Sequence, residues 1–459
     1  MRRRKRILGR RVNADLNLQF GDEQLTSHAG LELFARRLRA MGFNELLRES
    51  FRGVDLRGDY SLVAVVRLLL AMLWVGGRRL RHVQFLSRDP LVMRFAGLVA
   101  LPDERTLSRW LKQFNQRALA CLRSLNLFLV TARIRVLGLA RLTLDLDGTV
   151  NPTGLRVAWA QRGFNPHQRK VPSYYPILAH VAQTGQIIDV KNRPGNVHDG
   201  ARSEAFVRGL IRDLRRRLGN GMKLEFRCDG AFFQRPLLHL LQRYGCEYAI
   251  KVPMWRWLGV KELIQMRMRW EPVAPGISGF AAVLPVPKWG LKLRVACYRK
   301  RVFHETAKNY QLDLFSPDDG TYEYSAVATN KTMTIANLWF FMAGRGAQEK
   351  TIAELKSGFA FDTVPTNHYG ANSAWQWLSV LAHNLFRDFQ ISMQEERGRK
   401  TRKRTFLFRL QSIGTARFEW LNTAGRLLRL ASGLTLRLPA SSKIEKTYAQ
   451  WAEKASRAA

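Results

Sequence analysis

Carboxylates at the ends of two expected strands are the residues best suited to chemistry. Residues 141–147 alternate polar and apolar side chains, so Asp145 and Asp147 share one face of a strand. Residues 224–229 form a second expected strand, which also ends in an aspartate, Asp229. Open α/β sheets place their sites at the carboxyl ends of strands, and a buried carboxylate is costly unless a cation meets it. These aspartates therefore predict a metal site, although a turn or helix cap before Gly148 would also explain the first two.

Glu349 is a third candidate because of its place on an expected helix. Arg345, Glu349 and Lys356 are four and seven positions apart, which puts them within about 40° of one another around a helix. Such a stripe is usually a salt-bridged surface. Beside two strand-end aspartates, however, it predicts a carboxylate ligand flanked by two cations that clamp phosphate. Glu354 falls on another side of the same helix.

Two aspartates and one glutamate offer the oxygen ligands that Mg²⁺ and Mn²⁺ prefer. Two such ions roughly 3.5–4 Å apart activate a water or a 3′-hydroxyl and stabilise the leaving oxygen during attack at phosphorus. The acids therefore predict two Mg²⁺ or Mn²⁺ ions and phosphodiester chemistry.

The charge of the chain indicates the substrate of that chemistry. The 459 residues include 75 Lys and Arg but only 36 Asp and Glu, a formal net charge of +39. An excess of this size points to a polyanion, and a nucleic acid is the expected partner. The apolar fraction of 46% excludes a disordered polycation. Arginines interrupt every long apolar stretch, so no membrane partner is expected. The four widely spaced cysteines are expected to be thiols in a reducing cytoplasm.

The change of periodicity along the chain predicts its organisation. Apolar residues recur at helical spacing before residue 137, short alternating strands follow, and helices return after residue 335. A meander of strands followed by alternating helices and strands predicts an α/β fold, with helices packed on a mixed sheet. The expected segments are a basic arm (1–26), an all-helical DNA-binding region (27–137), the first part of the core (138–252), a Trp-rich β insertion (253–335), the second part of the core (336–395), and a basic linker with a helical tail (396–459).

Basic residues outside the core are candidate DNA contacts. Arg105 and Arg109 share one face of a helix that is expected to start after Asp103. That face suits a recognition helix or a solvated basic surface. The arm and the charge run from Arg397 to Arg404 suit either phosphate or solvent.

Taken together, these segments resemble the DDE transposases of bacterial insertion sequences, and within them the IS4-like and IS1380-like group. The likeness covers most of residues 25–390 and rests on the order of five segments: Leu144–Val150, Arg193–Asp199, Arg227–Phe233, Arg345–Gly358 and Asn372–Leu385. The resemblance implies a ribonuclease-H-like core. It also implies a β-strand insertion, which the long gap between Asp229 and Glu349 accommodates.

The resemblance assigns a role to each acid. The family's Asp-x-Thr pattern falls on Asp147, with Asp145 as a rival, and Asp229 and Glu349 match the second and third acids. The family's Tyr-x2-Arg-x3-Glu-x6-Lys signature matches at Arg345, Glu349 and Lys356, but Met342 stands at the Tyr position. That departure puts a DNA contact in question and leaves metal binding intact.

Two features near the expected site have two interpretations each. The loop before residue 200 either brings Asn196 and His198 to the scissile phosphate or caps the following helix through Asp199. A Trp of the insertion either stacks on a base flipped from the DNA, as the resemblance implies, or packs in the core.

The sequence thus predicts a DNA transposase that binds the terminal inverted repeats of its element, cuts the phosphodiester and joins the 3′-hydroxyl to target DNA. Asp147, Asp229 and Glu349 would hold the metals, and Arg345 and Lys356 would clamp phosphate. Synapsis of two ends implies a homodimer or a larger assembly, acting at the bacterial nucleoid in the cytoplasm. The alternatives are a catalytically inactive DNA-binding derivative and a structure-specific nuclease on the same core.

Overall fold

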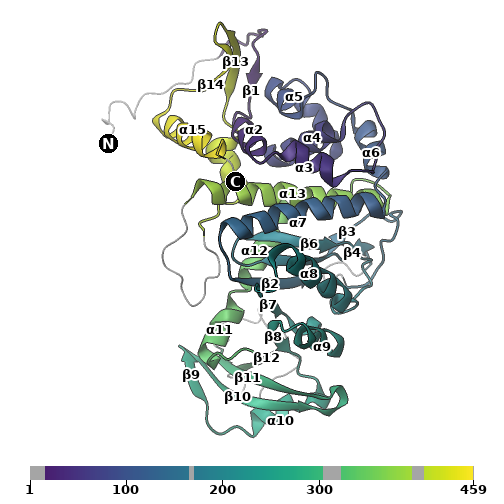
Figure 1. Ribbon diagram of the computed structural model, residues 1–459, viewed down its shortest axis with the longest axis vertical. Coiled ribbons are helices and arrows are strands. Elements are labelled where there is room, and N and C mark those ends of the chain that lie inside the picture. The colour runs from purple at the N-terminus through teal and green to yellow at the C-terminus, as the bar shows by residue number, and fades with distance from the viewer. Residues whose placement is uncertain (1–15, 165–169, 303–321, 395–407, 458–459) are drawn as a thin grey trace.

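The computed structural model describes residues 16–164, 170–302, 322–394 and 408–457. Along its longest axis, a helical layer at one end is followed by a central sheet covered by helices and then by an extension of that sheet (Figure 1). Most of the expected basic arm lies outside the described residues. The charge run from Arg397 to Arg404 also lies outside them.

The helical layer is built from the N-terminal part of the chain (Figure 1). Side-chain oxygens of Ser61, Asp89, Asp103 and Asn115 accept backbone N–H bonds at the starts of four helices, which fixes where each one begins. The apolar stretch after Ser61 is a core helix, and the described residues include no helix long and apolar enough to cross a membrane. The elements are α2 (Leu31–Ala40), α3 (Phe43–Ser50), α4 (Leu62–Val75), the 3-10 helix η1 (Leu80–Leu86), α5 (Pro90–Ala96), α6 (Glu104–Lys112) and α7 (Gln116–Val136).

A nine-stranded mixed sheet runs from the centre of the molecule to the end opposite the helical layer. Strands β6, β5 and β2 are antiparallel neighbours, and β7 and β8 follow on the other side of β2 in parallel. This order is that of a ribonuclease-H-like core, so the predicted fold class is confirmed. The strands are β2 (Arg141–Gly148), β5 (Ile177–Val181), β6 (Gln186–Lys191), β7 (Lys223–Cys228) and β8 (Glu247–Val252), and the short β3 (Asn151–Pro152) and β4 (Ser173–Tyr174) pair beside them.

The two faces of β2 differ as the alternation predicts. Leu142, Leu144 and Leu146 pack in an apolar core with side chains of α8 (Ser203–Leu218) and α9 (Arg235–Arg243). Thr143 and Asp145 point to the opposite face, where they contact Glu225 and Arg227 of β7. The sheet therefore has one apolar face and one face that carries charge.

The β-rich insertion continues the central sheet. β12 pairs antiparallel with β8, and β11, β10 and β9 follow in turn. Without β12, β8 would leave its backbone groups unpaired at a sheet edge, which explains why the insertion joins there. The elements are η3 (Arg256–Leu258), α10 (Val260–Gln265), β9 (Glu271–Ala274), β10 (Ile277–Val286), η4 (Pro287–Trp289), β11 (Leu291–Arg301), β12 (Tyr322–Thr329) and α11 (Ile335–Ala343).

Helix α13 (Tyr369–Met393) joins the helical layer to the sheet. It is buried along nearly its whole length and contacts α4, α6, α7 and β6. Figure 1 shows α13 beside α7 between the two layers. The preceding helix, α12 (Gly346–Phe359), lies against the charged face of β2, where Gln348 Nε2 donates to the Asp145 carbonyl oxygen at 3.1 Å.

The C-terminal part combines helices with a hairpin. β13 and β14 are antiparallel, and β1 (Leu25–Thr26) from the N-terminal part pairs with β13. The first and last described segments therefore share a small sheet, an addition to the helical regions expected at both ends. The C-terminal elements are α14 (Ile413–Ala416), the π-helix η6 (Arg417–Leu421), β13 (Gly425–Leu430), β14 (Gly433–Arg437) and α15 (Ser442–Ala455).

Candidate active site

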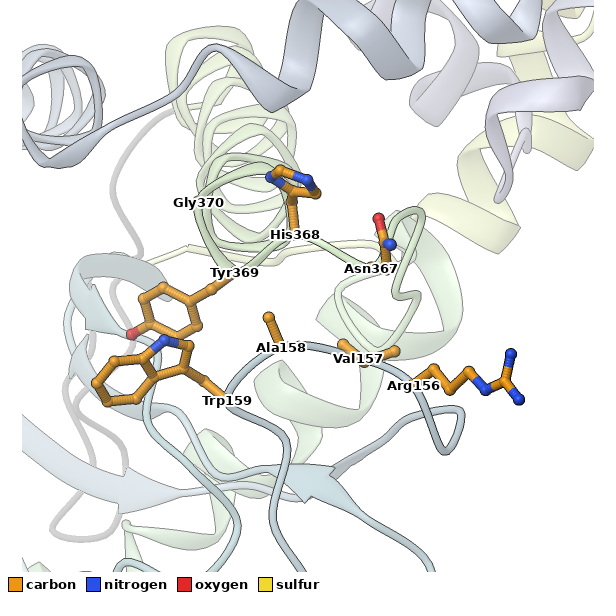
Figure 2. Close-up of a pocket in the computed structure, with 8 residues that line it drawn as sticks. All are labelled: Arg156, Val157, Ala158, Trp159, Asn367, His368, Tyr369 and Gly370. Carbon is orange, nitrogen blue, oxygen red and sulfur yellow. The ribbon is translucent and has the colours of Figure 1, made fainter.

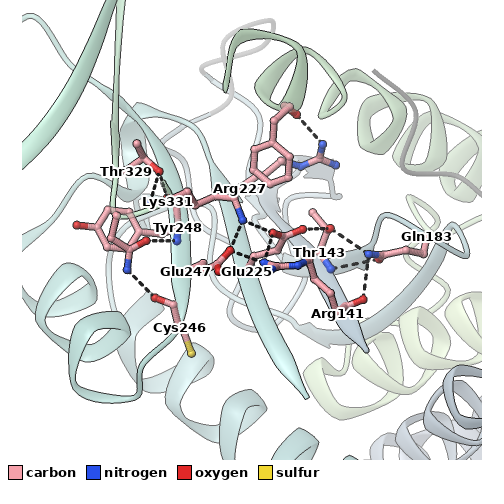
Figure 3. Close-up of polar contacts among 12 residues, drawn as sticks. Arg141, Thr143, Gln183, Glu225, Arg227, Cys246, Glu247, Tyr248, Thr329 and Lys331 are labelled. Atoms are coloured by element: carbon pink, nitrogen blue, oxygen red, sulfur yellow. Dashed lines mark hydrogen bonds and ion pairs between the residues drawn. The ribbon is translucent and has the colours of Figure 1, made fainter. Parts of the chain in front are cut away.

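On the charged face of the sheet, near the amino ends of the strands, two carboxylates pair with two cations (Figure 3). Glu225 and Glu247 each pair with both Arg141 and Lys331. The Thr143 hydroxyl also donates to Glu225. Two cations thus neutralise two carboxylates, and this pairing allows the charges of Glu225 and Lys331 to be buried.

Asp145, the next residue of β2 on this face, is also fully paired. Its side chain is completely buried, and Arg227 donates to both carboxylate oxygens, at 2.6 and 2.8 Å. His180 Nδ1 lies 3.1 Å from Oδ2. Burial alone would raise the pKa of Asp145, but Arg227 and His180 outweigh it and hold the pKa below its ordinary value. Both oxygens of Asp145 are therefore occupied by partners within the protein.

Asp147 and Asp229 meet at the carboxyl ends of β2 and β7. The parallel register pairs Asp145 with Arg227, so the aspartates two residues further along each strand are neighbours. Arg345 lies between them, with Nη2 at 3.1 Å from Asp147 Oδ2 and 4.0 Å from Asp229 Oδ2. The Asp229 side chain is 34% exposed and also accepts the Ala231 N–H. Two acids of the predicted trio are therefore brought together around one guanidinium.

A third carboxylate, that of Asp199, reaches the same place. The Tyr175 hydroxyl donates to Asp199 Oδ2 at 2.7 Å, and Arg193 Nη2 lies 3.4 Å from Oδ1. A Cβ added to Gly148 would stand 1.8 Å from Asp199 Oδ1, so this carboxylate lies against the backbone next to Asp147. The capping role expected of Asp199 is wrong, because α8 starts at Ser203 after Arg202 in a left-handed conformation.

The crowding of carboxylates changes their protonation. Burial raises the pKa of Asp147 to about 7, with further contributions from the Asp229 and Asp199 charges, although Arg345 opposes the shift. The pKa of Asp199 is also raised, first by burial and then by the charge of Asp229. The site therefore carries more negative charge than Arg345 compensates.

Glu349 lies on helix α12 and does not contact these acids. Arg345 precedes the helix and reaches Asp147, and Lys356 Nζ donates to the Val150 carbonyl oxygen at 2.7 Å. Glu349 shares their stripe and is exposed, and its carboxylate makes no ion pair or hydrogen bond within the described part of the chain. Among the described residues, no three His, Cys, Asp or Glu side chains stand close enough to hold a metal ion.

The other expected DNA contacts lie outside the carboxylate cluster. His198 is exposed beside Asp199, and its Nδ1 accepts the Gly200 N–H at 3.2 Å. Asn196 is exposed on the same loop. Arg105 and Arg109 are exposed on α6, whose apolar side packs into the helical layer.

Met342 and the insertion tryptophans take apolar places. Met342 packs on the cluster that joins α11 to the extended sheet. Trp255 and Trp257 are 42% and 43% exposed and stack on each other with ring centroids 5.7 Å apart, whereas Trp270 packs on Phe280. Trp255 also contacts the buried Phe233, four residues after Asp229, so this exposed pair lies near the end of β7.

Asp199 and Tyr175 belong to the carboxylate cluster although the sequence did not predict either of them there. Asp199 was visible as an acid in the loop after β6, but its usual role in such a loop is capping. Tyr175 carries no local signal, because its contact with Asp199 depends on how β4 and the loop after β6 pack together.

Comparison with known proteins identifies the family. The family model described as "Transposase DDE domain group 1" matches residues 9–262, more than half of the chain. The chain belongs to this transposase family. The match includes Asp147, Asp199 and Asp229 and ends before Glu349, which the geometry likewise leaves outside the cluster.

Two further comparisons add little to this assignment. No curated protein matches the transposase chain. A solved structure described as a piggyBac transposase synaptic complex with hairpin DNA is similar at a TM-score of 0.41 and 12% identity, covering 87% of this chain and 80% of that chain.

Proposed function

We propose that this DDE transposase binds the terminal inverted repeats of a bacterial insertion sequence, cuts the phosphodiester at each end and joins the 3′-hydroxyl to target DNA. The observation that carries the proposal is the meeting of Asp147 and Asp229 at the ends of adjacent parallel strands. The finer placement, in the IS4-like and IS1380-like group, rests on the segments quoted above. Synapsis of two ends would require at least a homodimer, working at the nucleoid in the cytoplasm.

The residues present fit a divalent cation. Burial, with the Asp229 and Asp199 charges, raises the pKa of Asp147 to about 7, so a divalent cation would be bound there in exchange for a proton. Hard carboxylate oxygens suit Mg²⁺ or Mn²⁺, and we propose two ions per site. Such ions would activate the attacking water or 3′-hydroxyl and stabilise the leaving oxygen.

Asp147, Asp229 and Glu349 are the proposed ligands. Glu349 is included because it lies on the α12 stripe between two residues that already contact the end of β2, Arg345 and Lys356. Its exposed carboxylate pairs with nothing in the described chain and is available to a ligand. Asp199 would add negative charge beside Asp147. Tyr175 and Arg193 would fix the orientation of the Asp199 carboxylate.

The cations around the cluster would bind the DNA backbone. Arg345 has to leave the gap between Asp147 and Asp229 when metal binds, and its guanidinium would then be free to hold a phosphate oxygen. Lys356, His198 and Asn196 line the same end of the sheet, and Arg105 and Arg109 would contact DNA further away, on the helical layer. The stacked Trp255 and Trp257 would receive a base flipped from the DNA end.

Strand cleavage by single variants tests this proposal. Asp147→Ala, Asp229→Ala and Glu349→Ala should each abolish Mg²⁺-dependent cleavage of DNA that carries the element's ends, while binding of those ends in EDTA stays near the wild-type level. Glu445→Ala, an exposed acid on α15, is the control and should cut normally. Cleavage retained by Glu349→Ala would remove it from the ligand set.

One observation favours a second candidate, a DNA-binding derivative without catalysis. Arg345 already supplies a positive charge between the two strand-end acids, and Glu349 stands apart from them. In that case Mg²⁺ would neither raise the melting temperature of the protein nor support cleavage, and DNA would still bind.

A further inference from the structure

An open pocket lies beyond the carboxyl end of β2, between the loop that follows Asp147 and the start of α13 (Figure 2). It has a volume of about 630 Å³ and is lined by Arg156, Val157, Ala158, Trp159, Asn367, His368, Tyr369 and Gly370. The lining contains two basic side chains and no acid, so it matches the charge of a phosphodiester. It is separate from the Trp255 and Trp257 pair of the insertion.

Trp159 presents an aromatic face in this pocket. Its side chain is 66% exposed, which is costly for an indole in water. Its ring lies beside that of Tyr369, with centroids 5.8 Å apart, and Tyr369 in turn meets the buried Tyr174 edge-on at 5.8 Å. Figure 2 shows the Trp159 and Tyr369 rings at one end of the pocket and Arg156 at the other.

The backbone holds Trp159 in a strained conformation. Its φ is 64°, in the left-handed region that disfavours a bulky side chain. The neighbouring Ala158 is fixed from both sides, because its N–H donates to the Asn367 carbonyl at 2.9 Å and its carbonyl accepts the Tyr174 hydroxyl at 2.6 Å. Such strain persists only where the surroundings enforce it, and it is concentrated at functional sites.

Contacts connect the pocket to the carboxylate cluster. Lys356 binds the carbonyl of Val150, and Asn151 donates to the Phe361 carbonyl at 2.9 Å, so the loop after Asp147 is tied to the end of α12. Tyr174 supports the pocket, and the next residue, Tyr175, donates to Asp199. A nucleotide in the pocket would therefore be close to a strand held at the cluster.

We propose that this pocket binds one nucleotide of the DNA substrate, with its base out of the duplex and stacked on Trp159 and its phosphate held by Arg156. The inference rests on the proposed function, because it takes DNA as the substrate. The indole supplies a sequence-independent stacking surface, and the acid-free lining accepts the backbone charge.

The experiment compares Trp159→Ala, Trp159→Phe and a control, Phe418→Ala, in the full-length protein. Phe418 is 93% exposed on η6, outside the pocket. Binding is measured in EDTA by fluorescence anisotropy, using a short single-stranded oligonucleotide of mixed sequence and the same sequence as a closed duplex. Trp159→Ala should weaken single-strand binding about 5- to 150-fold, the range that one stacked base supplies, and duplex binding far less. Trp159→Phe should keep most of the affinity, and Phe418→Ala all of it.

Photocrosslinking of the unmodified protein makes the test independent of folding of the variants. A single-stranded oligonucleotide with 5-iodouracil should crosslink to the peptide that contains Trp159. Wild-type affinity in Trp159→Ala, an equal loss in Phe418→Ala or Trp159→Phe, or crosslinks confined to other peptides would overturn the inference. Failure of the proposed function would instead appear as absence of metal-dependent cleavage by the wild-type protein, which neither measurement requires.

Discussion

Two stretches of the same sheet face, two residues apart along β2 and β7, differ in how far their carboxylate charges are compensated by cations. Toward the amino ends of the strands, Glu225 and Glu247 share Arg141 and Lys331 (Figure 3), and further along β2 the buried Asp145 is matched by Arg227. At the carboxyl end, Asp147, Asp199 and Asp229 lie near one another, and Arg345 is the one cation among the described residues that pairs with both strand-end aspartates. The paired acids stabilise the fold by being neutralised. The end acids are less completely compensated, which is why we propose them as the functional group.

The largest expected effect comes from removing one of the compensated charges, that of Asp145. Asp145→Asn leaves the Arg227 guanidinium buried without its counter-charge, and losing one partner of a buried pair costs about 3–5 kcal/mol. We expect this loss in the free energy of unfolding, measured with urea on the full-length protein. Asp147→Asn is the matched control, the same change two residues further along β2, and should cause no comparable loss. Equal losses in the two variants would show that the two acids are not in different environments.

The second effect is a pH dependence of stability that comes from Asp147, one of the acids at the carboxyl end. The fold raises the pKa of Asp147 from 3.8 to about 7, so the folded protein holds a proton that the unfolded chain releases. This penalty is absent below about pH 4, grows between pH 4 and 7, and is complete above pH 7, where it approaches roughly 4 kcal/mol. The stability of the wild-type protein relative to Asp147→Asn should therefore fall as pH rises through this window.

The measurement is urea unfolding of both proteins at a series of pH values. Adding Mg²⁺ at pH 8 should remove most of the difference, because a cation bound only to the folded site stabilises it. A pH-independent difference between the two proteins would contradict the raised pKa.

The contrast between the two stretches was only partly accessible from the sequence. Alternation placed Asp145 and Asp147 on one face, and β2 and β7 turned out to be parallel neighbours, so Asp147 and Asp229 meet as expected. The choice between Asp145 and Asp147 needed the cross-strand register, which pairs Asp145 with Arg227 and which no local pattern encodes. The position of Asp199 depends on the packing of a loop against Gly148, and the β1–β13 pairing joins opposite ends of the chain.

A smaller effect tests whether the position of Asp199 matters. Gly148→Ala puts a methyl group where the Asp199 carboxylate lies, so that carboxylate must move although no charge is removed. Overpacking of this kind costs about 1–3 kcal/mol, and we expect slower Mg²⁺-dependent cleavage in addition. Gly154→Ala is the control, because a Cβ there meets nothing within 4 Å. Normal cleavage by Gly148→Ala would exclude Asp199 from the site.

The smallest effect on stability should accompany one of the largest on activity. Glu349 is exposed, so Glu349→Gln should change the free energy of unfolding by less than about 0.5 kcal/mol while abolishing cleavage. Glu354 lies on the same helix but pairs with the buried Arg387 and accepts the Ile413 N–H. Glu354→Gln should therefore destabilise the protein, and its cleavage per folded molecule should stay normal. The two variants make the same chemical change, five positions apart on α12. Loss of stability at Glu349 together with loss of activity at Glu354 would show that the other side of the helix faces the acids.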